Sequence, residues 1–139
     1  MRKCFLASLA LLAASALVSC GGSSVSGSSA KGFYISITNL AYSPLDLQAP
    51  PGATITVINN DAMQHSVTSE ATSGAFTFGS VAGISFDTQP FTGTVTFTLP
   101  AGAANGTVIP FFCTVHRNTM ATPNAQITIN SAAQPGPAP

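Results

Sequence analysis

Apolar and polar residues alternate with a period of two along most of the chain beyond residue 32. The segment 33–38 reads FYISIT, and three later segments, 54–58, 94–99 and 126–129, read TITVI, TVTFTL and QITI. A period of two places alternate side chains on opposite faces of a β-strand. The β-branched residues in these segments suit a pleated surface that is buried on one side. The pattern therefore predicts strands, each with one face toward a core.

Turn signals separate the predicted strands. APPGA at 49–53 precedes one strand, and AGAANGT at 101–107 joins two others through an Asn-Gly pair. No segment shows a helical period, and the stretch 71–91 is ambiguous. We count seven to nine short strands with alternating faces, which predicts an all-β fold, a Greek-key β-sandwich.

The first residues have the layout of an export signal. Arg2 and Lys3 precede an apolar run at 5–18, which is too short to span a membrane as a helix. The run ends in LVSC at 17–20, which resembles the lipobox of bacterial lipoproteins. That resemblance implies cleavage before Cys20 and lipidation of its side chain. An ordinary signal peptide with a chance cysteine is the alternative, and both interpretations predict an exported protein.

The sequence divides into four parts. Residues 1–19 form the predicted lipoprotein signal peptide, and 20–32, rich in Gly and Ser, form a lipidated tether. Residues 33–130 form one domain, and 131–139 contain too few apolar side chains to pack and are predicted to be disordered. We expect a protein anchored by lipid in the bacterial cell envelope, on the periplasmic side or at an outer membrane.

Charged residues are few. The whole chain carries four Lys or Arg and four Asp or Glu, and after removal of the signal the formal balance is −2. No basic patch is present, so nucleic acid is not an expected partner.

Three residues with metal-binding side chains are concentrated in FFCTVHRNTM at 111–120. Cys113, His116 and Met120 lie within eight residues of one another, and the only other histidine is His65. If Cys4 leaves with the signal and Cys20 carries lipid, Cys113 is the one free thiol of the mature chain. The alternation of 107–113 places Cys113 on the inward face at the end of a strand. A Greek-key sandwich can bring this strand end and His65 to one pole.

The four donors select a metal by their chemistry. Thiolate and thioether are soft ligands, and imidazole is borderline. Two His and one Cys in a trigonal arrangement with a weak axial Met make a blue-copper site. Taken singly, a buried Cys, a His on a strand or a Met after a loop is more often a packing residue. Their occurrence together favours a copper site.

With these residues in view, the domain resembles the cupredoxins, the plastocyanin- and azurin-like type 1 blue copper proteins. The resemblance covers 33–130 and rests on PPGATITVINNDAMQHSV, GTVIPFFCTVHRNTM and NAQITI. It implies that His65, Cys113, His116 and Met120 bind one copper ion. It also implies an eight-stranded Greek-key sandwich and one-electron transfer between redox proteins, without enzymatic activity.

The sequence departs from the family pattern at the ligand loops. The spacing Cys-x2-His-x3-Met lies between those of plastocyanin-, amicyanin- and azurin-like members. Ser66 stands where plastocyanins and azurins usually have an Asn that joins the two ligand loops. We expect Ser66 and Asn60 to lie just behind the ligands.

The residues around the ligands suggest how partners approach. We expect an electron to pass through the exposed edge of His116. Phe112, Arg117 and Met63 should form the rim on which a redox partner docks, and Arg117 would attract an acidic partner. The donor and acceptor are redox proteins of unknown identity, and the protein itself is expected to be a monomer.

Two other functions fit part of the sequence. A copper carrier or buffer would use the same ligands, but the chain lacks the Met- and His-rich tracts associated with copper transfer. A metal-free interaction sandwich would leave the donor cluster unexplained. Oxidase chemistry is not expected, because a dinuclear copper site needs two cysteines and a three-copper cluster needs further histidines.

Overall fold

The computed structural model describes residues 29–139. The predicted signal peptide, Cys20 and most of the tether lie outside them. The described chain forms nine strands and one short 3₁₀ helix, at these bounds: β1 Lys31–Thr38, β2 Ala41–Ser43, β3 Asp46–Ala49, β4 Thr54–Asn59, β5 Thr68–Ser69, β6 Gly93–Thr98, β7 Val108–Phe112, η1 Arg117–Thr119, β8 Asn124–Ile129 and β9 Gly136–Pro137.

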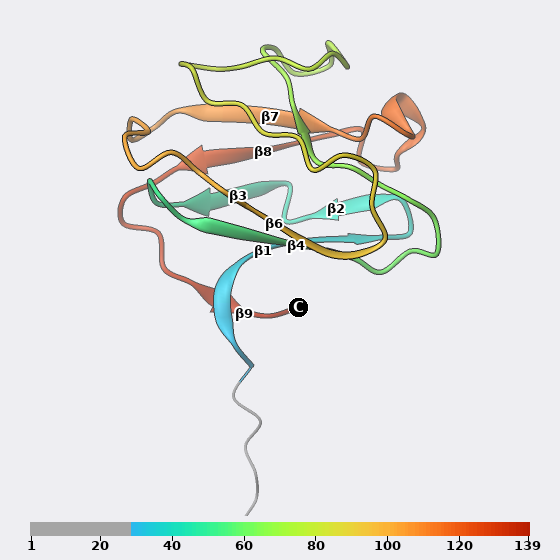
Figure 1. Ribbon diagram of the computed structural model, residues 1–139, viewed down its shortest axis with the longest axis horizontal. Helices are drawn as coiled ribbons and strands as arrows, with labels where there is room; N and C mark the ends of the chain where they lie inside the picture. Colours follow the sequence, from blue (N-terminus) through green and yellow to red (C-terminus); the bar gives the residue numbers. More distant parts are fainter. Residues whose placement is uncertain (1–28) are drawn as a thin grey trace, which may run out of the picture.

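The strands form two sheets that pack face to face (Figure 1). One sheet has the order β2-β1-β4-β6, with β9 paired to β1, and the other has the order β3-β8-β7-β5. The all-β sandwich that the alternation predicted is therefore confirmed. Within the described residues, no helix is long and apolar enough to cross a membrane.

The core lies between the sheets and contains the apolar faces that the alternation predicted. Ile35, Ile37, Ile55 and Val57 of the first sheet are fully buried. The second sheet contributes the fully or almost fully buried side chains Ile109, Phe111, Ile127 and Ile129. Burial of such side chains stabilises a fold by about 1.5–3 kcal/mol each.

Strand directions place the ends of β4 and β7 at one pole of the sandwich. β1 runs parallel to β4, with Phe33 opposite Ile55 and Ile37 opposite Asn59. The chain therefore enters β1 at the opposite pole, roughly 20 Å away at about 3.3 Å per strand residue. β4 leads into the loop before His65, and β7 leads into Cys113. In Figure 1 the green segment after β4 and the orange segment after β7 reach the same side.

Two segments differ from the sequence expectations. Between β4 and β6 the chain is held by the short β5 and by isolated bridges, including His65 with Phe91 and Glu70 with Phe78, instead of a continuous strand from His65. The expected disordered tail is instead ordered here: β9 pairs with Lys31–Gly32, and the Ala138 N–H donates to the Ala30 carbonyl at 3.0 Å. Pairing of backbone groups needs no apolar side chains, which explains why composition did not indicate it.

Candidate metal centre

Three of the four predicted donors come together at the pole where β4 and β7 end. Cys113 directly follows β7, and His116 directly precedes η1. The Arg117 N–H donates to the Cys113 carbonyl at 2.7 Å, which folds the loop so that His116 faces back toward Cys113. His65 is held by two backbone hydrogen bonds with Phe91, of 3.1 and 2.9 Å.

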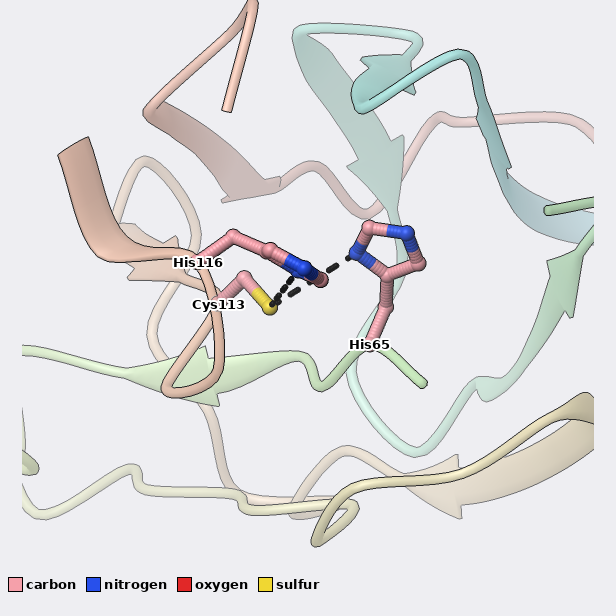
Figure 2. A group of neighbouring side chains, drawn as sticks. All are labelled: His65, Cys113 and His116. Atoms are coloured by element: carbon pink, nitrogen blue, oxygen red, sulfur yellow. Dashed lines mark hydrogen bonds between the residues drawn. The ribbon is translucent and has the colours of Figure 1, made fainter. Parts of the chain in front are cut away.

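The three side chains point at one another (Figure 2). The Cys113 Sγ lies 3.7 Å from the Nδ1 atoms of both His65 and His116. All three donor atoms lie within 4.8 Å of one another. Bonds of about 2.3 Å to a thiolate and about 2.0 Å to an imidazole, typical of zinc, would at 120° separate sulfur and nitrogen by about 3.7 Å. The donor spacing therefore fits one small metal ion in a trigonal arrangement.

The environment of the donors also suits a metal. His65 and Cys113 are fully buried, and His116 is half-buried. Burial lowers the pKa of His65 below its usual value, and the nearby His116 lowers it further, while Asp61 opposes both effects. His65 is therefore held neutral, which is the form that binds a metal through a ring nitrogen.

Met120 lies at the end of the same loop. It follows η1 directly, is only 4% exposed and packs in the hydrophobic core. The burial is compatible with a thioether near the donor cluster. Its assignment as the axial ligand stays a prediction.

Ser66 joins the two ligand loops, in the position where the resemblance implied an Asn. The Ser66 N–H donates to the Cys113 Sγ at 3.4 Å, and the Thr114 N–H donates to the Ser66 Oγ at 2.9 Å. The Ser66 Oγ also lies 3.0 Å from the hydroxyls of both Thr114 and Thr68. The Thr68 hydroxyl donates to Asp87 at 2.9 Å. A chain of hydroxyl groups thus links the loop of Cys113 to the segment around His65.

Ser66→Ala should destabilise the fold by about 2 kcal/mol, because it leaves the Thr114 N–H without its acceptor. The midpoint of urea unfolding of the metal-free protein measures this change. Ser80→Ala is the control, since Ser80 is exposed, and such a surface change should stay within about 0.5 kcal/mol. Equal midpoints for the two variants would contradict this role of Ser66.

Asn60 does not occupy the expected position behind the ligands. Its side chain is exposed and donates to the Thr38 hydroxyl at 3.1 Å. The neighbouring Asn59 is buried instead, and its amide donates to the Met63 and Phe91 carbonyls at 2.9 and 3.0 Å. Alternation along β4 explains why Asn59 is buried and Asn60 is exposed, because the side chain of Asn59 continues the inward face of the strand.

Phe112 does not belong to an exposed rim. Its side chain is 1% exposed and packs edge-on against Phe76, with ring centroids 5.9 Å apart. The loop after β5 covers the outer face of β7, so both faces of this strand are buried. Met63 and Val115 are each 46% exposed, and Arg117 is exposed.

Sequence reasoning missed two residues next to the donors. Asp61 was not among the predicted site residues, yet its Oδ2 lies 3.0 Å from the His65 Nε2. The spacing of four between Asp61 and His65 was the available signal.

Tyr42 is the second residue that sequence reasoning missed. It is 2% exposed, and its hydroxyl donates to the Ser66 carbonyl at 2.7 Å. Burial, and then the nearby Cys113, raise the pKa of Tyr42 well above its usual value, so it stays a neutral donor.

Comparison with known proteins identifies the fold. No protein-family model matches the sequence, and no curated protein matches it. Among solved structures, the chain is similar to the purple cupredoxin from Nitrosopumilus maritimus, with 23% identity, a TM-score of 0.53 and coverage of 70% of this chain and 99% of that one. It is also similar to amicyanin from Paracoccus versutus, with 17% identity, a TM-score of 0.51 and coverage of 71% and 81%.

A third similar structure is the dithionite-reduced auracyanin from the photosynthetic bacterium Roseiflexus castenholzii. It is 20% identical, with a TM-score of 0.50 and coverage of 73% of this chain and 98% of that one. The architecture is therefore the cupredoxin fold. On this fold, His65, Cys113 and His116 are positioned to form a type 1 copper site.

Proposed function

We propose that this protein is a type 1 copper protein that carries single electrons between redox partners and catalyses no reaction itself. The observation that carries the proposal is the convergence of one sulfur and two Nδ1 atoms, each nitrogen 3.7 Å from the sulfur. This donor set favours copper among the first-row metals. The similarity to the purple cupredoxin, amicyanin and auracyanin structures supports the same class.

The protein's part in electron transfer is to hold the donors still. A bound copper ion would supply a Cu(II)/Cu(I) couple that gains and loses one electron. The strand end at Cys113, the bridge between His65 and Phe91 and the hydroxyl of Ser66 fix the donors from three sides. Donors that cannot move far require little rearrangement when the charge of the site changes.

His116 is the most accessible of the three donors. It is half-buried, whereas His65 and Cys113 are fully buried. Exposed Met63 and Val115 provide apolar surface on the two ligand segments, and exposed Arg117 adds a positive charge. We therefore infer that electrons pass through the His116 edge, and that the partner is a redox protein with an apolar contact surface.

The location of the protein is part of the proposal. The signal-like segment at 1–19 and the cysteine at 20 favour a protein anchored by lipid in the bacterial cell envelope. Incorporation of labelled palmitate into the full-length protein, and its loss in Cys20→Ser, would support the anchor. Equal labelling of the two proteins would contradict it.

Loading with copper tests the proposed site. One equivalent of Cu(II) at neutral pH should produce an intense visible absorption from thiolate-to-copper charge transfer, and ascorbate should bleach it reversibly. A protein that stays colourless under these conditions is not a type 1 copper protein. A carrier, by contrast, would surrender its copper to a moderate chelator within hours.

Met120→Leu tests the predicted axial ligand. It should retain the visible absorption, because Cys113 and both histidines remain. The reduction potential should rise, since Cu(II) loses a weak fourth donor that Cu(I) needs less. Voltammetry of the two copper-loaded proteins measures the difference, and identical potentials would remove Met120 from the ligand set.

A further inference from the structure

Asp61 connects three segments at the metal pole. Its Oδ1 accepts the Asn39 N–H at 2.6 Å, and its Oδ2 accepts the Leu40 N–H at 2.9 Å. The same Oδ2 lies 3.0 Å from the Nε2 of His65. The side chain of Asp61 is 12% exposed and that of His65 is 0% exposed, so the contact lies at the boundary of the buried site.

The hydrogen bond fixes which His65 nitrogen faces the donors. A carboxylate only accepts hydrogen bonds, so the His65 Nε2 must carry the proton. The Nδ1 is then the unprotonated nitrogen, and it is the atom that faces the Cys113 Sγ. Figure 2 shows the second ring nitrogen of His65 pointing away from Cys113. The ring is thus both oriented and held in the tautomer that binds a metal.

The carboxylate cannot turn away easily, because it accepts the N–H groups of Asn39 and Leu40 in addition to its contact with His65. Asn39 and Leu40 both adopt positive φ angles, of 54° and 62°, so this turn aims two successive N–H groups at one side chain. In the described residues, this is the only contact between a carboxylate and a donor of the metal centre.

The same turn reaches the loop that ends in Met120. The Leu40 carbonyl accepts the N–H of Ala121, the residue after Met120, at 2.8 Å. Asp61 therefore fixes the turn at Asn39 and Leu40, and the Leu40 carbonyl fixes the end of the loop. One side chain couples the position of His65 to that of the predicted axial residue.

We propose that Asp61 is a positioning residue of the metal centre, which locks His65 as an Nδ1 ligand and uses its negative charge to favour the oxidised metal. The effect on the oxidation state rests on the proposed copper function. A carboxylate hydrogen-bonded to a ligand imidazole makes that imidazole more basic. Its charge also stabilises the ion of higher positive charge, and partial burial weakens the screening by water.

The first part of the test needs no variant and no metal. Nitrogen-15 NMR of the metal-free native protein distinguishes the two tautomers of His65. We expect a protonated Nε2, coupled to a hydrogen that exchanges slowly with solvent. A protonated Nδ1 in the folded, metal-free protein would overturn the proposal.

The second part compares Asp61→Asn with Asp46→Asn. Both variants remove one negative charge, but Asp46 is exposed and bonds only the side chains of Gln48 and Thr128. Asp61→Asn should weaken Cu(II) binding about 10–100-fold, the range for loss of a partner behind a metal ligand. Cu(I) binding should weaken less, so the potential should rise. Asp46→Asn should change neither affinity.

The outcomes separate this proposal from the proposed function. If Cu(II) gives no visible absorption but His65 keeps its Nε2 proton, the copper function fails while the positioning role stands. If native protein absorbs strongly but Asp61→Asn leaves the ratio of Cu(II) to Cu(I) affinities unchanged, the role of the charge is overturned. Loss of both affinities by the same factor would assign to Asp61 a purely structural role and also overturn it.

Discussion

Cys113→Ser abolishes the intense visible absorption that we expect after loading with Cu(II). The band requires a thiolate bound to copper, and Cys113 is the free cysteine of the described chain. A serine hydroxyl in the same position keeps the shape of the site but supplies no sulfur. The expected loss is complete and is measured by absorption spectroscopy at equal protein and copper concentrations.

Asn118→Ala is the control for this variant. Asn118 lies in η1, between the two predicted ligands His116 and Met120, and is exposed. Its replacement should leave the band in place. Persistence of the band in Cys113→Ser would show that our assignment of the sulfur ligand is wrong.

Glu70→Ala should destabilise the metal-free protein by about 3 kcal/mol. Glu70 is fully buried, and its carboxylate accepts the N–H groups of Gly74 and Phe76 at 2.9 and 2.7 Å and the amide of Asn124. Alanine leaves these donors without an acceptor and opens a cavity. The free energy of urea unfolding measures the effect.

Glu70→Gln separates the effect of the charge on stability from the effect of the side-chain shape. Glutamine can accept through one oxygen only, so we expect a smaller loss of about 1–2 kcal/mol. The control is Asp46→Asn, which removes a charge at an exposed position. A Glu70→Ala protein as stable as this control would contradict a role for Glu70 in holding the segment 71–79.

The sequence was sufficient to predict the strands that bury one face and expose the other. Ile55 and Val57 alternate with threonine in β4, and Val95 and Phe97 do the same in β6. In each case one face packs on the core and the other meets water, so burial leaves a period of two in the sequence. The sequence also indicated His65, Cys113 and His116, because residue types this rare in the chain stand out.

Sequence reasoning was insufficient where hydrogen bonds replace apolar alternation. The segment after β5 is held by Ser69, Thr68 and Glu70 through their side chains, and such bonds follow no period. Phe112 was misplaced for a related reason, since the loop that covers it is fixed by the buried Glu70. Asp61 was missed because its partners Asn39 and Leu40 lie more than twenty residues away.

The parallel arrangement of β1 and β4 has a practical consequence for studying this molecule. Residues 30–32 enter at the pole opposite His65 and Cys113, where β9 also pairs. A bead, an electrode surface or a fusion partner attached ahead of Ala30 would therefore leave the donor end facing outward. Protein immobilised through that terminus should transfer electrons to a soluble oxidant faster than protein attached through a residue of the loop 114–119.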